Sequence, residues 1–202
     1  MDTLLGELGN WSSVEAVAAV LAVAYVVLAA RQSIWCWPCA ILSTGIYCGI
    51  FFELALYQQA LLQLFYVGLG IYGWRKWQSG GEQGKGLRVS NWRVSQHLSS
   101  IALILTLTAV TGWITSRFTQ TPMPYLDALT AWGSVIAAWM MARKVLENWL
   151  YWLVVDALLV VLSWRARLPA TLLLYVIYVG MAIVGYFSWR KSQELRASGA
   201  LG

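Results

Sequence analysis

Seven apolar runs, separated by short polar segments, divide this sequence. Several of them approach the ~20 residues that a helix needs to cross the hydrocarbon core of a bilayer. Inside lipid the backbone must satisfy its hydrogen bonds within its own segment, so such runs fold as helices. Only 11% of the 202 residues are charged, whereas soluble domains carry about a quarter. The sequence predicts an all-α integral membrane protein with seven transmembrane helices, at residues 14–30, 34–52, 57–74, 97–115, 126–142, 147–164 and 170–188.

The basic residues lie between these runs and are distributed unevenly. Eleven of the 14 Lys and Arg residues fall on one side of the predicted membrane and three on the other. Because loops rich in Lys and Arg stay in the cytoplasm, we expect the N-terminus outside and the C-terminus inside. This topology explains the net charge of +5 without nucleic acid as a partner. Four tryptophans near the ends of runs are predicted to anchor the protein at the membrane interface: Trp11, Trp77, Trp92 and Trp189.

An internal repeat relates the first three runs to the last three. Residues 14–77 align without a gap with residues 126–189, at an offset of 112. The identical pairs include residues that apolar composition alone would not keep in one register, namely Arg31/Arg143, Trp37/Trp149, Tyr66/Tyr178, Gly68/Gly180, Gly73/Gly185 and Trp77/Trp189. Residues 78–125 then supply a polar, Gly-rich loop and one linking helix. A single linking helix makes the two repeats parallel, which is the 3+1+3 plan of full-length SWEET transporters, with a solute site near the midplane between the repeats.

A polar stripe crosses the sixth run, which reads ENWLYWLVVDALLVVLSW. Asn148, Trp152 and Asp156 are spaced i, i+4 and i+8 and therefore share one helix face, with Trp149 beside them. An ionisable residue inside a membrane span is costly and usually functional. A carboxylate can neutralise a cationic ligand, and indole faces attract cations and stack on flat rings. The alternative is that Asp156 pairs with a neighbouring polar group and fixes the helix packing.

Gln63 and Tyr66 lie on a second polar stripe, in the third run. Gln63 can exchange hydrogen bonds with the amide or aminopyrimidine of a ligand, or it can join two helices. Its repeat counterpart is Tyr175 and not a second glutamine, just as Asp156 is matched by Thr44. Shared residues indicate scaffold, whereas mismatched polar residues indicate a site for one asymmetric ligand.

The second run begins with WCWPC, residues 35–39. A Cys-x-x-Cys redox role needs a βαβ context that this chain lacks, so we interpret Trp37 and its neighbours as an aromatic entrance to the run. No metal or other cofactor is expected, because His97 is the only histidine and no ligand cluster surrounds it. An enzyme would need a cluster of acids, histidines or a nucleophile–base pair. We therefore predict no catalytic residues.

Three segments of the chain, LYQQALLQLFYVGLGIYGWRKW, RKVLENWLYWLVVDALLVVL and IWCWPCAILSTGIY, resemble the PnuC family of bacterial B-vitamin transporters. The resemblance covers essentially the whole chain. It implies a 3+1+3 fold in the bacterial inner membrane and facilitated diffusion of a vitamin that a cytoplasmic kinase then traps. It also implies that Gln63 faces the ligand and that Trp152 lies near the bound base, and Asn148 with Trp149 matches the E-N-W signature of the family. Nicotinamide riboside is the best-known substrate of the family, and a branch called PnuT carries thiamine.

Position 156 is where the chain departs from the nicotinamide riboside pattern. That branch resembles W-x-x-x-N, whereas this chain has Trp152 followed by Asp156. An ionised carboxylate only accepts hydrogen bonds, so it suits the amino group and the positive charge of thiamine. We therefore predict thiamine as substrate, with nicotinamide riboside as the alternative and proton-coupled transport as a further one. The predicted substrate contacts are Trp37, Gln63, Tyr66, Asn148, Trp149, Trp152 and Asp156; the other expected partners are membrane lipids and, through small-residue positions, a second copy of the chain.

Overall fold

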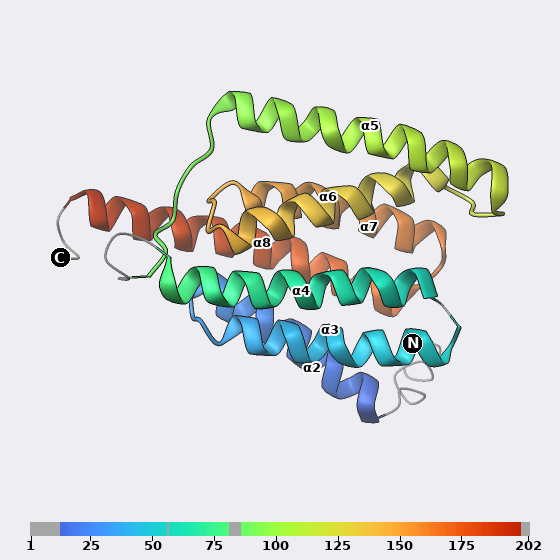
Figure 1. Ribbon diagram of the computed structural model, residues 1–202, viewed down its shortest axis with the longest axis horizontal. Coiled ribbons are helices and arrows are strands. Elements are labelled where there is room, and N and C mark those ends of the chain that lie inside the picture. Colours follow the sequence, from blue (N-terminus) through green and yellow to red (C-terminus); the bar gives the residue numbers. More distant parts are fainter. Residues whose placement is uncertain (1–12, 56, 81–85, 199–202) are drawn as a thin grey trace. The chain divides into compact units, whose positions relative to one another are not determined.

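The computed structural model describes residues 13–55, 57–80 and 86–198, and most of them lie in helices (Figure 1). The helices are α2 (Ser13–Ala30), α3 (Cys36–Glu53), α4 (Tyr57–Ser79), α5 (Val94–Phe118), α6 (Pro124–Ala142), α7 (Asn148–Arg165) and α8 (Pro169–Ala197). Each of the seven predicted runs coincides with one of these helices, and the described residues contain no β-strand. The prediction of an all-α chain is therefore confirmed.

Three of the helices are long and apolar enough to cross a membrane by length and composition alone. They contain the spans Cys36–Glu53, Val94–Phe118 and Thr171–Ala197, and α2 is a shorter apolar helix over Val14–Ala30. In α4 and α7 the polar side chains of the two predicted stripes lower the hydropathy, as do the basic residues at their ends. A residue that would bind a polar ligand inside the membrane thus weakens the hydropathy signal of its own span.

The backbone repeats the offset seen in the sequence. Helices α3 and α7 have the same length, and α7 begins at the position that the repeat aligns with the start of α3, as α8 does for α4. The turns after α2 and α6 place Gln32 and Lys144 in the left-handed region, with φ of 57° and 55°. The turns after α3 and α7 place Ala55 and Arg167 there, also with φ of 57° and 55°. Such backbone is uncommon outside glycine, so its recurrence at one spacing indicates that the two triplets of helices share one local plan.

The chain forms two compact units. One takes in the described residues of 13–89, 142–144 and 187–198, and the other takes in 90–141 and 145–186. The boundaries predicted from the repeat, 14–77, 78–125 and 126–189, follow sequence similarity and differ from this division. The turn after α6 and the end of α8 group with the first unit because their side chains pack there.

In the first unit, α3 contacts both α2 and α4. The Ser43 hydroxyl donates to the carbonyl of Ala18 over 2.8 Å and joins α3 to α2. Gly73 of α4 admits the ring of Trp37, and a Cβ at that position would overlap the ring. Polar and small residues therefore set the close approach of these helices, as is usual inside a membrane.

A buried aromatic cluster closes one end of the first unit. The rings of Trp77 and Trp189 are 5.8 Å apart, and the Lys144 ammonium stands 4.5 Å from the Trp77 ring. The Trp189 indole donates to the carbonyl of Ala29 over 2.9 Å. Trp77 is 4% exposed and Trp189 is 0% exposed, so the prediction that they anchor at the membrane surface is wrong. Trp11, for which the same role was predicted, lies outside the described residues.

The second unit is joined by similar contacts. The Trp132 indole donates to the Thr111 hydroxyl over 3.1 Å and links α6 to α5. A Cβ at Gly133 would stand 2.8 Å from the Val155 side chain, which brings α6 close to α7. At the start of α5, His97 Nδ1 lies 3.1 Å from the Tyr151 hydroxyl of α7. These contacts hold α7, with its polar stripe, against α5 and α6.

Candidate functional site

Asp156 is buried near the middle of α7, with 5% of its surface exposed. No hydrogen bond or ion pair joins its carboxylate to another residue in the described part of the chain. The counterpart of Asp156 in the first unit is Thr44, whose hydroxyl bonds within its own helix to the carbonyl of Ala40 over 2.8 Å. A buried carboxylate without a partner is costly. The packing alternative, in which Asp156 pairs with a neighbour, therefore finds no such neighbour among the described residues.

Tyr175 on α8 belongs to the same unit as Asp156 and lies near enough for the carboxylate charge to affect its hydroxyl. It is half-buried, and its ring lies 6.2 Å from that of Tyr178. Sequence reasoning did not place Tyr175 in the site, although it identified it as the counterpart of Gln63. This relationship could have indicated Tyr175, because a residue that the repeat aligns with a predicted site position is itself a candidate for the site.

Asn148 is the first residue of α7 and is fully buried. Its amide nitrogen donates to the carbonyl of Val145 over 2.6 Å. Its amide oxygen is also buried and has no hydrogen-bond partner among the described residues. The side-chain amide is thus held in place on one side and keeps an unused acceptor on the other.

The stripe on α7 therefore combines two acceptors without partners and one indole. Asn148 and Asp156 lie about 12 Å apart along the helix axis, from eight residues at 1.5 Å each. Trp152, which is half-buried, lies between them on the same face. Acceptors at both ends favour a ligand that offers N–H or O–H donors or a positive charge, and the indole favours a flat ring.

Trp149 and Trp37 have a different environment. Trp149 packs against Gly185, where a Cβ would stand 2.6 Å from the indole ring. Trp37 packs in the same way against Gly73, and its ring lies 5.3 Å from that of Trp77. Both indoles are buried and serve the packing of their own unit. Their predicted contact with substrate stays a prediction.

Gln63 and Tyr66 lie on α4 and belong to the first unit. Both are half-buried, and the Tyr66 ring meets that of Phe65 edge-on at 5.9 Å. No described residue forms a hydrogen bond with the Gln63 amide, so the structure supplies no helix-joining bond for it. The alternative in which Gln63 joins two helices thus lacks a partner in the described part of the chain. The four α7 residues belong to the second unit.

The arrangement contains no set of metal ligands. Among the described residues, no group of three or more His, Cys, Asp and Glu side chains could hold a metal ion. The chemistry that the α7 stripe offers is recognition of a ligand, through acceptors and an aromatic face.

Comparison with known proteins decides the family. The family model described as "Nicotinamide mononucleotide transporter" matches residues 12–191. The chain belongs to this family. It is therefore a membrane transporter, and the prediction that it is not an enzyme agrees with the transporters that it resembles.

Individual members of the transporter family resemble the chain over most of its length. The nicotinamide riboside transporter PnuC of Escherichia coli (strain K12) is 28% identical over 94% of this chain and 90% of its own length. The riboflavin/roseoflavin transporter RibM of Streptomyces davaonensis is 28% identical over 89% of this chain and 84% of its own. The crystal structure of the vitamin B3 transporter PnuC matches with a TM-score of 0.71 and 26% identity, over 94% of this chain and 85% of that one.

Proposed function

We propose that this transporter carries nicotinamide riboside. The buried Asp156 carboxylate has no hydrogen-bond partner among the described residues and shares a helix face with Trp152 and the Asn148 amide oxygen, which suits a flat cation with donor groups. Nicotinamide riboside is a flat cation with an amide NH2 and ribose hydroxyls as donors. The observation that favours nicotinamide riboside over thiamine is that similar transporters of Escherichia coli and Neisseria mucosa are both named for nicotinamide riboside.

Thiamine is the second candidate, and Asp156 is again the reason. Thiamine combines a cationic ring with an aminopyrimidine NH2, and an ionised carboxylate can accept from that group. The relatives reported above are named for nicotinamide riboside and riboflavin, and they lend no support to the thiamine prediction. Nicotinamide riboside therefore takes first place here, although the sequence alone favoured thiamine.

The transport mechanism follows from the same proposal. Two parallel three-helix repeats and one linking helix would alternate access to a site near the midplane. Transport would be facilitated diffusion, driven by a cytoplasmic kinase that traps the vitamin, with the N-terminus outside and the C-terminus in the cytoplasm. Gln63 and Tyr66 keep their predicted role as contacts of the ligand.

Calorimetry on the purified protein tests the choice of substrate. Nicotinamide riboside, thiamine and riboflavin are titrated separately into the same preparation. We expect nicotinamide riboside to bind most tightly. Binding of thiamine about tenfold tighter, which corresponds to about 1.4 kcal/mol, would reverse the assignment.

Uptake into proteoliposomes that contain only this protein tests the mechanism. We expect equilibration of radiolabelled nicotinamide riboside and no response to an imposed proton gradient. Accumulation above the outside concentration when a gradient is applied would replace facilitated diffusion by proton coupling. An absence of any uptake would contradict the claim that this chain transports nicotinamide riboside unaided.

A further inference from the structure

Four segments that are distant in sequence are fastened together at one end of the first unit. The buried rings of Trp77 and Trp189 join the end of α4 to the end of α8. The Trp189 indole and the Ser188 hydroxyl donate to the last carbonyls of α2, at Ala29 and Ala30. Lys144, in the turn after α6, completes the cluster through its contact with the Trp77 ring. The end of the unit is therefore a packed structure and not a set of independent loops.

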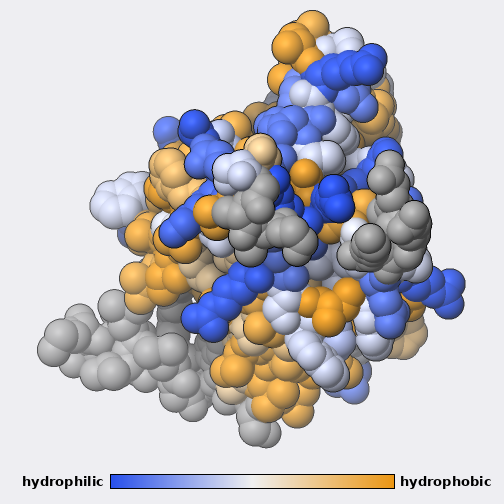
Figure 2. Space-filling view, turned by 90° about the vertical axis from the view of Figure 1, so that its left-hand side faces the viewer, coloured by the Kyte–Doolittle hydropathy of each residue, from blue (hydrophilic) through white to orange (hydrophobic). Residues whose placement is uncertain are grey.

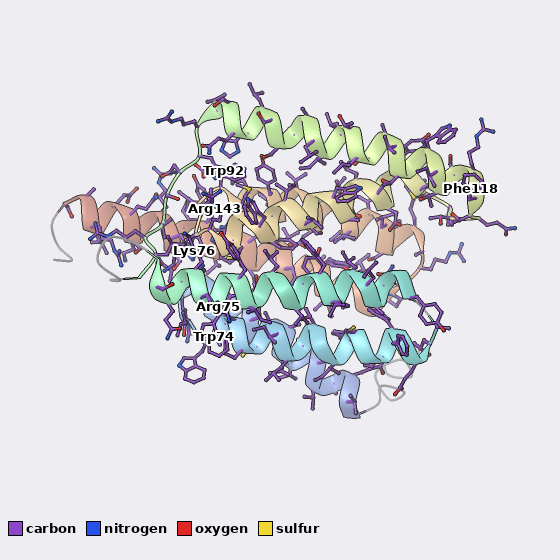
Figure 3. The ribbon with its side chains drawn as sticks, in the orientation of Figure 1. Trp74, Arg75, Lys76, Trp92, Phe118 and Arg143 are labelled. Atoms are coloured by element: carbon purple, nitrogen blue, oxygen red, sulfur yellow. The ribbon has the colours of Figure 1, made fainter. Side chains whose placement is uncertain are left out.

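Each of these segments also carries exposed basic side chains beside the buried cluster. We call six of them the basic collar: Arg31 after α2, Arg75 and Lys76 on α4, Arg143 after α6, and Arg190 and Lys191 on α8. Figure 3 shows Arg75, Lys76 and Arg143 at the same end of the unit. Hydrophilic side chains gather over this end in Figure 2, with apolar side chains next to them.

Little negative charge offsets the collar. Glu194 accepts from Arg190 over 3.0 Å, and both of these side chains are more than half exposed. Between two described residues no other ion pair is formed. Six basic side chains against this one carboxylate leave the described part of the collar with a net positive charge.

The surroundings of the collar are those of a membrane surface. Trp74, which directly precedes Arg75, is exposed, and so is Tyr72 in the same turn of α4. Farther along α4 the side chains of Leu64, Phe65 and Ile71 are exposed as well. Aromatic residues between an apolar face and a group of cations occupy the level of lipid headgroups.

We propose that the basic collar binds the phosphate groups of anionic phospholipids. Membrane topology alone requires only that basic residues lie in the loops of one side. The collar residues instead lie on helix ends and turns that the buried aromatic cluster holds in place. A backbone that is already fixed loses less conformational entropy when its side chains bind an anion. Basic positions at helix ends next to lipid-facing surface are the recognised pattern for such headgroups.

Native mass spectrometry of protein released from phosphatidylglycerol vesicles tests the proposal. The variant carries Arg75→Gln, Lys76→Gln and Lys191→Gln, three exposed positions outside the predicted ligand contacts. The matched control carries Arg117→Gln, Arg165→Gln and Arg167→Gln, which remove the same charge from exposed positions in the second unit. Each Lys or Arg near an anionic surface raises affinity about fivefold.

We expect the collar variant to bind phosphatidylglycerol at least about fivefold more weakly than the control, with phosphatidylcholine retained equally by both. Equal loss in the two variants would assign the effect to net charge and overturn the collar as a site. Unchanged binding of phosphatidylglycerol in the collar variant would overturn the lipid assignment and leave an acidic protein surface as the occupant. Melting temperatures of all three proteins in phosphatidylcholine confirm that each variant is folded before the comparison is made.

Discussion

The indole of Trp149 lies against the α-carbon of Gly185, so closely that a Cβ at Gly185 would stand 2.6 Å from the ring. The first unit repeats the relationship between Trp37 and Gly73, where an added Cβ would overlap the ring as well. The glycine follows the tryptophan at the same separation in both pairs, and the repeat alignment superposes one pair on the other. One way of packing a large ring against a bare helix backbone is thus used twice.

Gly185→Ala should destabilise the protein by about 1–3 kcal/mol, because the added methyl group overpacks a buried ring. The measurement is the melting temperature of the purified protein in detergent. Gly180→Ala is the matched control on the same helix, since a Cβ at Gly180 meets nothing within 4 Å. Alanine is the better helix former, so this control should melt at the wild-type temperature or slightly above. Equal melting of the two variants would contradict the packing described for Trp149.

Much of the fold could be predicted from the sequence because its signals are local or repeated. Apolar runs predicted every helix in the described residues, although by length and composition only three of these helices could cross a membrane. The repeat offset anticipated the matched glycines beneath Trp37 and Trp149. It did not show the matched left-handed residues Gln32 and Lys144, since these differ in type and only their backbone is alike.

Lys144 should make stability depend on pH in the alkaline range. Burial lowers the pKa of Lys144 from its ordinary 10.5 to about 8, and Arg196 adds to the effect. The unfolded chain then holds the proton more strongly than the folded chain between pH 8 and 10.5, so stability rises with pH across this window. The stability that the folded protein gains from the deprotonation of Lys144 is fully present above pH 10.5 and is lost as the pH falls through about 8.

Lys144→Met should remove this dependence. The difference between wild type and variant in free energy of unfolding should change by up to about 3 kcal/mol across the window. Chemical unfolding at a series of pH values measures it, and Lys76→Met, at an exposed lysine of α4, is the control that should keep the wild-type slope. If the stability of Lys144→Met still rises with pH as in the wild type, the pKa of Lys144 is not lowered by folding.

Side-chain environments were harder to predict than helices, for a physical reason. Trp77 and Trp189 stand at span ends, where a tryptophan can face either headgroups or protein. The contacts that bury these two tryptophans come from α2 and from Lys144. The hydropathy of a single helix contains no information on such contacts. The site showed the same limit, since Tyr175 comes near Asp156 through the packing of α8 beside α7.

Trp152→Leu should weaken binding of nicotinamide riboside without unfolding the protein. A cation over an indole face contributes about 0.5–2 kcal/mol, so the dissociation constant should rise by roughly twofold to thirtyfold. Trp164→Leu is the control, because Trp164 lies on the same helix and is 74% exposed. Calorimetry on both variants makes the comparison, and an equal effect of the two substitutions would remove Trp152 from the binding face.

Asp156→Asn should change which vitamin binds best. An amide can both donate to and accept from the carboxamide of nicotinamide riboside, whereas it loses the ionic complement to the thiazolium and amino group of thiamine. A hydrogen bond to a charged group contributes about 1.5–3 kcal/mol, so the preference for nicotinamide riboside over thiamine should rise by about tenfold or more. Asp127→Asn makes the same substitution on α6 and should leave the preference unchanged. An equal ratio of the two dissociation constants in both variants and in the wild type would mean that Asp156 does not contact the ligand. Its buried carboxylate would then have a role only in the folded structure.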